Sequence, residues 1–390
     1  MMLVVQKYGG SSLATPKHIQ NAAQRISALK KSGSDVVVVA SAMGHTTDHL
    51  LKLARKTVKV PPSREVDMLL TAGERISMSL LSMALQDLGI PAISFTGSQS
   101  GIITTNDHTE AKIIDIRPHR ILEELGQGKV VIIAGFQGVS EKKEITTLGR
   151  GGSDTTAVAL AAVLKADRCE ILTDVDGLFS ADPRVVPAAK ILTQVDYDQA
   201  LEMASLGAKM QARSIELAKK FQVNVQISSS RTESSSGTLV QSQKVDPKTY
   251  IEQIKVSAVA TKDGFHLFHS KTSLPAILEI LVNANLPLRF LSFDGEKVTF
   301  LTEKEKVPLT RSFFEKQNLT YEEIENVSTV SVIGDGLIHS NRLSQRVIEF
   351  LKQENLECLL ISSHSASLSF VVRSAGKTIL ANFIHQHFLN

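Results

Sequence analysis

Short apolar runs alternate with longer amphipathic stretches along the first two-thirds of the chain. Residues 36–40 (VVVVA) and 129–134 (KVVIIA) are nearly continuous apolar runs, as expected of parallel strands that are buried on both faces. Residues 46–58 and 64–88 have the period of amphipathic helices. A Thr-Pro pair opens a further helix over residues 15–33, with threonine as the cap and proline in the first turn.

The same alternation continues as far as residue 227. Further strands are predicted at residues 3–6, 91–95, 169–173 and 223–227, and further helices around residues 117–125 and within 197–221. Strands and helices that alternate at these lengths predict an α/β sandwich with a mostly parallel sheet.

Polar or glycine-containing segments directly follow four of these strands. They are Lys7, Ser41, a loop at residues 136–138, and the pair Thr173 and Asp174. In open α/β sheets, ligands bind beyond the carboxyl ends of the strands. We therefore expect these segments to face one edge of the sheet, where a single site can form.

A glycine-rich stretch, residues 146–165 (TTLGRGGSDTTAVALAAVLK), leads into an Ala- and Leu-rich helix. Ser153 or Asp154 is expected to cap this helix, and the free N–H groups at its start can bind an anion. Arg150 can hold a carboxylate or phosphate through two hydrogen bonds. The alternative is a capped helix after a flexible loop, with Arg150 pointing into water.

Residues 228–243 are polar and rich in serine, which predicts a boundary or an exposed connection. Beyond them the chain repeats weakly with an offset of about seventy residues. Each copy has the pattern strand, helix, strand, strand, with the helices at 274–284 and 342–354. Two small α+β units would result, unless the similarity arose by chance. The predicted domains are residues 1–245, 246–325 and 326–390.

Composition excludes several classes of protein. Of the 390 residues, 43% are hydrophobic and 21% charged, which is typical of a soluble globular chain of more than one domain. The net charge of +3 is too small to favour nucleic acid or an anionic membrane. We find no signal peptide and no apolar run of transmembrane length. Two distant cysteines, Cys169 and Cys358, fit reduced thiols in the cytoplasm.

The candidate chemistry is that of phosphate and a charged substrate. Lys7, beside Gly9 and Gly10, suits a transferring γ-phosphate, whose catalysis depends mostly on positioning and charge stabilisation. No complete Walker sequence is present, and no GxGxxG follows a strand, which counts against a dinucleotide oxidoreductase. Glu74 has a helical context with Arg75 beside it, so a solvated surface ion pair is its simplest interpretation. We predict no protein metal site.

Six segments of this sequence resemble the aspartate kinase family, in that family's order. They are KYGGSS (7–12), SAMG (41–44), LTAGERIS (70–77), GFQGV (135–139), TLGRGGSDT (147–155) and TDVDGLFSADPRVVP (173–187). The resemblance covers essentially the whole chain, and the C-terminal repeat is similar to that family's pair of regulatory ACT domains.

The resemblance implies transfer of the γ-phosphoryl group of ATP to the β-carboxylate of L-aspartate. This reaction is the first step toward lysine, threonine, methionine and diaminopimelate. Lys7 would stabilise the transferring group, and Asp154 would be a second catalytic residue that organises Lys7, the phosphates and Mg²⁺. The Mg²⁺ would be held mainly through ATP. Arg150 would bind the α-carboxylate of aspartate and Glu74 its ammonium group.

The same resemblance assigns the remaining site residues. The implied nucleotide contacts are Lys7, Tyr8, Gly9, Gly10, Ser41, Thr173, Asp174, Phe179, Asp182, Pro183, Arg184 and Lys209. The implied aspartate contacts are Thr47, Glu74, Arg150, Gly151, Gly152 and Ser153. Phe179 stands where tyrosine is common, so a phenol hydrogen bond would be lost while the ring packing is kept.

The ACT-like repeat implies feedback control by lysine, threonine or both, and a homo-oligomer of two or more chains. Two alternatives stay open. One is another amino-acid kinase that acts on glutamate, acetylglutamate, carbamate or UMP. The other is an amino-acid sensor that has kept the fold without catalysis. The sequence favours neither a nucleic-acid nor a membrane partner.

Overall fold

The computed structural model describes residues 2–208, 210–232, 237–242, 255–286, 288–337 and 341–389. It divides into two compact units. The N-terminal unit comprises the described residues within Met1–Leu178, Ile191–Ser205 and Lys209–Lys244. The C-terminal unit comprises those within Phe179–Lys190, Leu206–Ala208 and Val245–Asn390.

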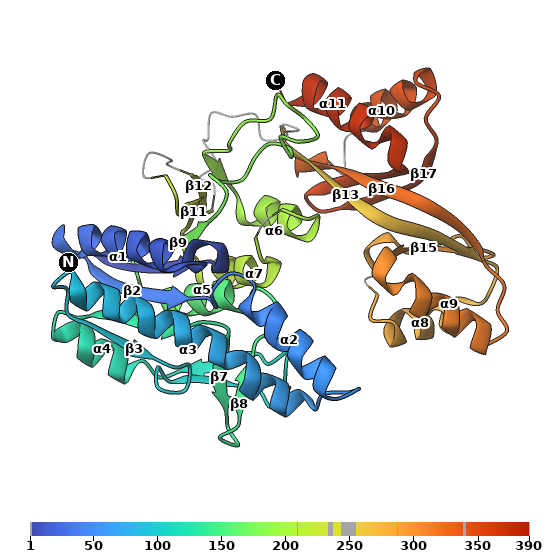
Figure 1. Cartoon of the computed structure of the whole chain (residues 1–390). Coiled ribbons are helices and arrows are strands. Elements are labelled where there is room, and N and C mark those ends of the chain that lie inside the picture. Colours follow the sequence, from blue (N-terminus) through green and yellow to red (C-terminus); the bar gives the residue numbers. More distant parts are fainter. Residues whose placement is uncertain are drawn as a thin grey trace. The chain divides into compact units, whose positions relative to one another are not determined.

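A large sheet of eight strands forms the centre of the N-terminal unit (Figure 1). Its strands are β1 (Leu3–Tyr8), β2 (Asp35–Ala40), β3 (Ala92–Phe95), β6 (Val130–Ala134), β9 (Arg168–Thr173), β10 (Gln194–Val195), β11 (Val225–Ser229) and β12 (Thr238–Val240). They lie in the order β10-β12-β11-β9-β1-β2-β6-β3, and every neighbouring pair is parallel except β11–β12. The predicted mostly parallel sheet is confirmed.

The carboxyl ends of the central strands lie in register. Tyr8 at the end of β1 lies opposite Ala40 of β2 and Leu172 of β9, and Ala40 lies opposite Ala134 of β6. The segments that follow these strands therefore leave the sheet along one edge, as the sequence predicts.

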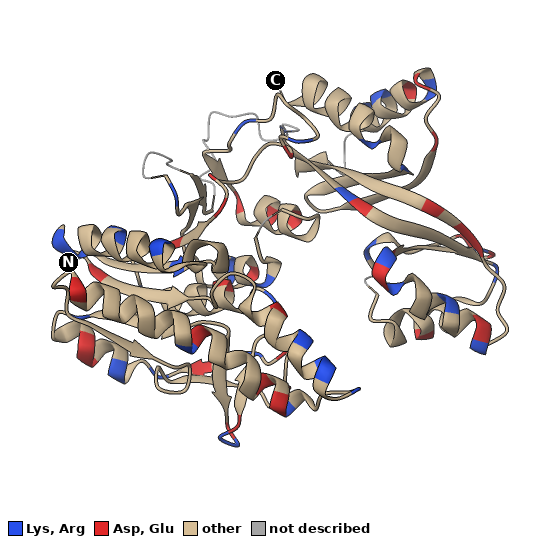
Figure 2. Ribbon diagram, viewed as in Figure 1, with Lys and Arg blue, Asp and Glu red and all other residues tan. Residues whose placement is uncertain are grey.

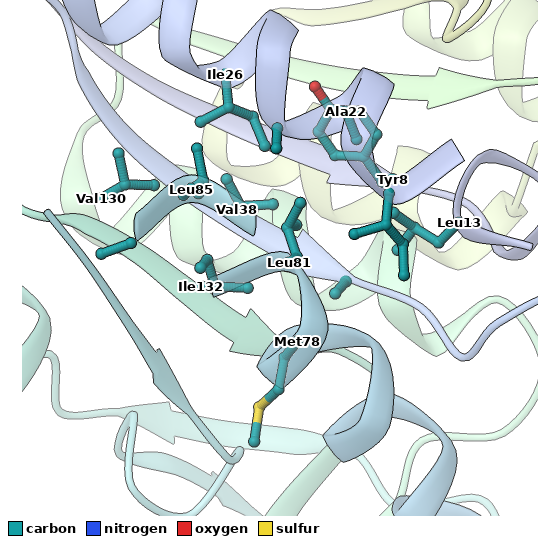
Figure 3. Close-up of a cluster of buried hydrophobic side chains, with 14 of the residues drawn as sticks. Tyr8, Leu13, Ala22, Ile26, Val38, Met78, Leu81, Leu85, Val130 and Ile132 are labelled. Atoms are coloured by element: carbon teal, nitrogen blue, oxygen red, sulfur yellow. The ribbon is translucent and has the colours of Figure 1, made fainter. Parts of the chain in front are cut away.

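Helices cover both faces of this sheet. The helices of the unit are α1 (Pro16–Lys31), α2 (Thr46–Thr57), α3 (Ser63–Asp87), α4 (His119–Gly126), α5 (Gly152–Leu164), α6 (Tyr197–Ser205) and α7 (Ala212–Phe221). One face packs against α1 and α3, where Ile26, Leu81 and Leu85 meet alternate side chains of β2 and β6 such as Val38 and Ile132 (Figure 3). Helix α5 contacts β1, β2 and β9 and packs against α7. Its first ten residues are all buried, as expected of a helix between the sheet and another helix.

A second, four-stranded sheet was not predicted. It consists of β4 (Ile102–Thr104), β5 (Ile113–Ile116), β7 (Gln137–Ser140) and β8 (Ile145–Thr147), in the order β5-β4-β7-β8. Strands of three or four residues are too short to show a clear period in the sequence. The segment at 136–138, which we expected to be a loop, is a turn at Phe136 (φ 69°) that leads into β7.

The serine-rich stretch was also misassigned in part. Residues 225–229 form β11, and Thr238–Val240 forms β12, whose Thr238 and Val240 are fully buried. Thr238 Oγ1 donates to the carbonyl oxygen of Leu192 (2.6 Å) and accepts from the N–H of Leu178 (2.8 Å). Hydroxyl groups can satisfy buried backbone in this way, so polar composition alone does not make a segment an exposed connection. Residues 233–236 and 243, also in this stretch, lie outside the described residues.

The C-terminal unit is built on a six-stranded antiparallel sheet, in the order β14-β15-β13-β16-β18-β17. Its strands are β13 (Lys255–Ser270), β14 (Ser292–Phe293), β15 (Val298–Glu303), β16 (Glu322–Asp335), β17 (Cys358–His364) and β18 (Ser367–Arg373). Its helices are α8 (Leu274–Asn283), α9 (Val307–Lys316), α10 (Asn341–Gln353) and α11 (Lys377–Phe388).

The predicted internal repeat is visible in this unit. Strand β13 is followed by α8, β14, β15 and α9, and β16 by α10, β17, β18 and α11. The short 3₁₀ helices before α9 and α11 begin at Lys304 and Ser374, which keeps the offset of seventy residues. This antiparallel region is consistent with ACT domains, while the domain limits given above stay a prediction. The predicted limit at residue 245 lies outside the described residues.

Strands β13 and β16 each run through both copies. Residues 265–270 of β13 pair with β15 of the first copy, and residues 255–262 pair with the part of β16 that also pairs with β18 of the second copy. The ladder shifts register between Lys262 and Phe265, where the two copies meet. The sheet of the second copy therefore includes residues 255–262 of β13, which come before all the other elements of both copies in the sequence.

The segment Phe179–Lys190 packs within the C-terminal unit. Ala181 and Val186 belong to the same buried cluster as Leu380 and Ile384 of α11. Polar contacts fix the segment as well: Ser180 Oγ lies 2.9 Å from His385 Nε2, and Asn382 Nδ2 donates to the carbonyl oxygen of Val185 (2.9 Å).

Charged residues of both signs are interspersed along the visible elements of each unit (Figure 2). Among the described residues, no helix combines the length and the apolar character needed to cross a bilayer.

Candidate functional site

A cavity of about 510 Å³ opens in the N-terminal unit beside the carboxyl ends of β1 and β2. Its lining includes Lys7, Gly10, Ser41, Thr47, Glu74, Arg150, Gly151, Gly152, Ser153 and Asp154. Ten residues that the sequence singles out, from five separate segments, therefore line one hollow. Phe136, from the segment 136–138 that was expected at this edge, lines the cavity as well. The lining also includes residues that were given no role from the sequence, namely Ala42, Gly44, Asp48, Leu51, Val66, Leu70, Thr109, Thr147 and Gly149.

Lys7 and Asp154 form an ion pair in the wall of this cavity. Lys7 Nζ lies 2.6 Å from Asp154 Oδ1, and each side chain is only 12% exposed. Lys7 comes from the end of β1, and Asp154 from the first turn of α5. A largely buried charge is tolerated only when it is paired, so each side chain fixes the position of the other.

The turn after Lys7 requires glycine at position 10. A Cβ atom at Gly10 would lie 2.9 Å from the carbonyl oxygen of Ala42 and 3.0 Å from that of Gly44. The carbonyl oxygen of Gly10 also accepts a hydrogen bond from the N–H of Gly44 (2.9 Å). The loops after β1 and β2 therefore lie in backbone contact beside Lys7, with main-chain groups near the cavity. Gly9 lies next to Lys7, and a Cβ atom there would be 3.5 Å from Nζ.

Glu74 is buried in α3, contrary to the surface ion pair that its sequence context suggests. It is 3% exposed, and its Oε1 accepts a hydrogen bond from the N–H of Ala42 (3.1 Å). Its Oε2 has no hydrogen-bond partner among the residues that the structure describes. Gly73 permits this arrangement, because a Cβ atom there would lie 2.8 Å from that of Ala42. Glu74 thus has one buried carboxyl oxygen without a partner, and it lines the same cavity as two cations, Lys7 and Arg150.

Burial raises the pKa of Glu74 from 4.5 to about 7, and main-chain hydrogen bonds, including that from Ala42, offset only part of the increase. A carboxyl group without a cation beside it keeps its proton in a low-dielectric environment. This carboxyl group would ionise more readily if a cation bound next to Oε2.

The glycine-rich loop differs from the expected capped start. The N-cap of α5 is Gly151, which has a left-handed φ of 73° and no side-chain cap hydrogen bond. Ser153 and Asp154 lie inside the first turn instead, and Asp154 is committed to Lys7. A Cβ atom at Gly151 would lie 2.5 Å from the flexible Gln211 side chain, which would have to move, and the left-handed φ itself favours glycine here.

Arg150 extends from this loop and is almost fully accessible. Its side chain is 92% exposed, and Nη2 lies 3.5 Å from Asp48 Oδ1 of α2. An ion pair as exposed and long as this one is weak. The guanidinium group can therefore leave Asp48 for a ligand carboxylate at little cost. Asp48 was missed because its segment shows only the pattern of an amphipathic helix.

The N-terminal unit also contains predicted nucleotide residues outside the cavity, two at the end of a strand and one in the hydrophobic core. Thr173 ends β9, beside Asp174, and its carbonyl oxygen accepts from the N–H of Ser230 (2.8 Å). The Tyr8 ring is fully buried in the cluster of α1 and α3 (Figure 3), so only its main chain faces the turn after Lys7. Burial also raises its pKa above the ordinary value.

The remaining predicted nucleotide residues lie in the C-terminal unit or outside the described residues. Phe179, Asp182, Pro183 and Arg184 belong to the C-terminal unit. Asp182 and Arg184 form an ion pair, with Arg184 Nη2 2.7 Å from Asp182 Oδ2, and hydrogen bonding from this guanidinium lowers the pKa of the Asp182 carboxyl group. Lys209 lies outside the described residues.

One group of side chains elsewhere has metal-ligand character. His266, Glu323 and Glu325 converge in the C-terminal unit. Arg311 already donates to both oxygens of Glu323, at 2.9 and 2.8 Å, and to Glu325 at 3.2 Å. A guanidinium group and a metal ion would compete for the same oxygens, so this cluster is better described as an ion-pair network.

Comparison with known proteins gives consistent results. Residues 2–229 match the Amino acid kinase family. The chain is 42% identical to the aspartokinase of Corynebacterium efficiens, over 100% of this chain and 96% of that protein. It is 40% identical to aspartokinase 2 of Bacillus subtilis, over 100% of this chain and 98% of that protein.

Solved structures share the fold over the full length. E. coli aspartokinase III in complex with aspartate and ADP has a TM-score of 0.82 at 24% identity, and the match covers 100% of both chains. The same enzyme in complex with lysine and aspartate also has a TM-score of 0.82, at 23% identity and with 100% of both chains covered.

The raised pKa of Glu74 predicts a pH-dependent stability. Between pH 4.5 and about 7 the folded chain keeps the Glu74 proton while the unfolded chain loses it, so stability falls as pH rises through this window. The free energy of unfolding of the wild type should fall by roughly 3 kcal/mol at most across this window, since one pKa unit corresponds to about 1.4 kcal/mol. In Glu74→Gln this fall should be absent. Calorimetric melting of wild type and variant from pH 5 to 8 measures this difference.

Glu65→Gln is the matched control, because Glu65 lies on the same helix but its side chain is 61% exposed. It removes one charge without removing a buried carboxyl group. Parallel pH profiles for wild type and Glu74→Gln would contradict the prediction.

Proposed function

This chain belongs to the aspartokinases of the amino acid kinase family, and we propose that its cavity transfers the γ-phosphoryl group of ATP to the β-carboxylate of L-aspartate. The product would be 4-phospho-L-aspartate, on the route to lysine, threonine, methionine and diaminopimelate. The observation that carries the proposal is the meeting of the Lys7–Asp154 pair, the free Oε2 of Glu74 and the accessible Arg150 in one cavity.

Aspartate binding needs one fixed cation and one fixed anion, since the amino acid is a zwitterion. Arg150 would exchange its weak contact with Asp48 for two hydrogen bonds to the α-carboxylate. Glu74 would accept from the α-ammonium group through Oε2, and the bound ammonium would favour the ionised carboxylate. The aspartate site would be completed by Thr47 and by the loop of Gly151, Gly152 and Ser153. The β-carboxylate of the bound aspartate would then point toward Lys7.

The chemical step needs no strong base, because the attacking group is already a carboxylate. One oxygen of the β-carboxylate forms a bond to the γ-phosphorus, and the bond from that phosphorus to the oxygen bridging the β- and γ-phosphates breaks. The bridging oxygen leaves on ADP with the electron pair. Lys7 would lie beside the transferring group and stabilise its negative charge, while Gly9, Gly10 and Ser41 would lie along the phosphates.

Asp154 would hold Lys7 in position during transfer and contribute to binding Mg²⁺. Among the residues that the structure describes, the cavity wall contains three carboxylates, Asp48, Glu74 and Asp154, and the last is next to Lys7. This donor set suits Mg²⁺ that is held mainly by ATP phosphates rather than by a protein cage. When bound, Mg²⁺ supplies charge neutralisation on the phosphates.

ATP as the donor is supported by the ADP in the E. coli aspartokinase III complex. We propose that Thr173 and Asp174, at the end of β9, contact the nucleotide. Phe179, Asp182, Pro183, Arg184 and Lys209 stay predicted nucleotide contacts, on the resemblance to the aspartate kinase family.

An assay that couples ADP release to NADH oxidation tests the function directly. ADP release should require aspartate, and glutamate should not replace it. Lys7→Ala should lower kcat about a hundredfold or more, since it removes the cation at the transferring group. Arg150→Ala should instead raise the KM for aspartate about 10- to 100-fold, as expected for losing a charge-assisted pair of hydrogen bonds.

Arg117→Ala is the control for Arg150→Ala, because Arg117 forms an exposed ion pair with Asp115 (2.9 Å) outside the cavity. Circular dichroism confirms that each variant is folded. A folded Lys7→Ala enzyme with wild-type kcat would place the phosphoryl site elsewhere, and turnover of glutamate, acetylglutamate, carbamate or UMP would identify a different kinase.

We propose that the C-terminal unit makes the enzyme sensitive to an amino acid. The paired strand–helix–strand–strand copies support this proposal, together with the lysine complex of E. coli aspartokinase III. Lysine, threonine or both should lower the rate at fixed aspartate. A titration that stays flat to millimolar concentrations of both amino acids would contradict the proposal.

We also propose a homo-oligomer of two or more chains in the cytoplasm. The proposal of assembly rests on the ACT-like unit, whose edge strand β14 exposes Ser292 and Phe293. The location is supported by the use of ATP and by two free thiols, Cys169 and Cys358. Light scattering at micromolar concentration should give the mass of at least two chains, and a mass of 42.4 kDa would contradict the assembly.

A further inference from the structure

We propose that Asp67 is a positioning residue for the aspartate side of the cavity, acting through Thr109 and Thr147. The proposal rests on the function given above. Asp67 is fully buried in α3, two turns before Glu74, and does not line the cavity itself. Thr109 and Thr147 do line it, on the side of Gly149 and Arg150.

Four hydrogen-bond contacts converge on the carboxylate of Asp67. Thr147 Oγ1 donates to Oδ1 (2.5 Å), and the N–H of Thr109 points to both oxygens (3.1 Å each). His108 Nδ1 lies 2.7 Å from Oδ2. An ionised carboxylate only accepts hydrogen bonds, so it suits a position at which donors from two separate segments meet.

These contacts hold Thr109 in an unfavourable backbone conformation. Its φ is 71°, which is costly for a β-branched residue unless the surroundings compensate. The double contact of its N–H with Asp67 supplies that compensation. The loop at residues 108–109 therefore takes its shape from a carboxylate on another element.

The loop at residues 108–109 and the residues after it also contact the segment 147–149, which leads to Arg150. The N–H of Ala111 donates to the carbonyl oxygen of Thr147 (2.9 Å), and a Cβ atom at Gly149 would lie 3.2 Å from the carbonyl oxygen of Thr109. Gly149 immediately precedes Arg150. Displacement of Thr109 or Thr147 would thus be transmitted to the segment that carries Arg150.

Asparagine at position 67 would break this arrangement with little change in volume. It offers one acceptor oxygen in place of two and brings an NH₂ group that faces donors. The expected consequence is a misplaced aspartate site, while the turn after β1 and the Lys7–Asp154 pair keep their own contacts. The KM for aspartate should change much more than the KM for ATP.

Glu170→Gln provides a control of matched burial. Glu170 is 7% exposed in β9, accepts from Gln6 Nε2 (2.7 Å) and pairs with Arg168 Nη2 (2.6 Å), away from the cavity. It converts a buried, hydrogen-bonded carboxylate into an amide without touching the cavity. If Asp67→Asn and Glu170→Gln lose similar stability, then weaker aspartate binding in Asp67→Asn alone reflects positioning and not general destabilisation.

Steady-state kinetics and aspartate calorimetry on the full chain test the proposal. Asp67→Asn should raise the KM and the dissociation constant for aspartate about tenfold, a factor typical of one displaced charge-assisted interaction, and leave the KM for ATP within about twofold. Glu170→Gln should leave both KM values within about twofold. Thr147→Val should act in the same direction as Asp67→Asn but more weakly, and should have no further effect in the Asp67→Asn background.

Each outcome decides the matter. Unchanged aspartate binding in Asp67→Asn, an equal weakening of aspartate binding in Glu170→Gln, or additive effects of Asp67→Asn and Thr147→Val would overturn the positioning role. If Asp67→Asn does not fold, Thr147→Val alone decides, and wild-type aspartate binding in that variant would overturn the role. Wild-type protein that neither binds nor phosphorylates aspartate would overturn the proposed function itself.

Discussion

The pairing of Lys7 with Asp154 is the constraint on which the N-terminal unit depends. It joins the end of a central strand to the first turn of a buried helix, so sheet and helix are held at the point where the cavity opens. Two charges that are each 12% exposed require each other. The loops after β1 and β2 then close around the pair through backbone contacts that only glycine at position 10 permits.

Three carboxylates in and behind the cavity differ because their surroundings differ. Asp154 faces a cation, Asp67 faces hydrogen-bond donors from a loop and from the end of β8, and Glu74 has one oxygen without a partner. Burial raises the pKa of Glu74, because no neighbouring charge balances the loss of solvent around this carboxyl group. The same functional group thus pairs with a lysine in one place and holds a loop in another, and in the proposed aspartate site the third would receive the ammonium group.

The sequence predicts the central elements well because their signals are local. Residues 36–40 and 64–88 correspond closely to β2 and α3, since a buried parallel strand and a long amphipathic helix each have a clear pattern. The strand β8, with three residues, and the contact between Asp67 and Thr147, eighty residues apart, have no local signal. The cap of α5 was misjudged for a related reason. Asp154 could cap the helix or meet Lys7, and only the fold decides between them.

The sharing of β13 and β16 between the two C-terminal copies limits how this part of the chain can be dissected. An expression fragment that starts after residue 270 would retain all later elements of the second copy yet lack the edge partner that residues 255–262 supply. Its β16 would expose main-chain donors and acceptors and tend to aggregate. Gene fusions or insertions that treat the two copies as independent folding units would therefore fail. The two copies must be exchanged between homologues together.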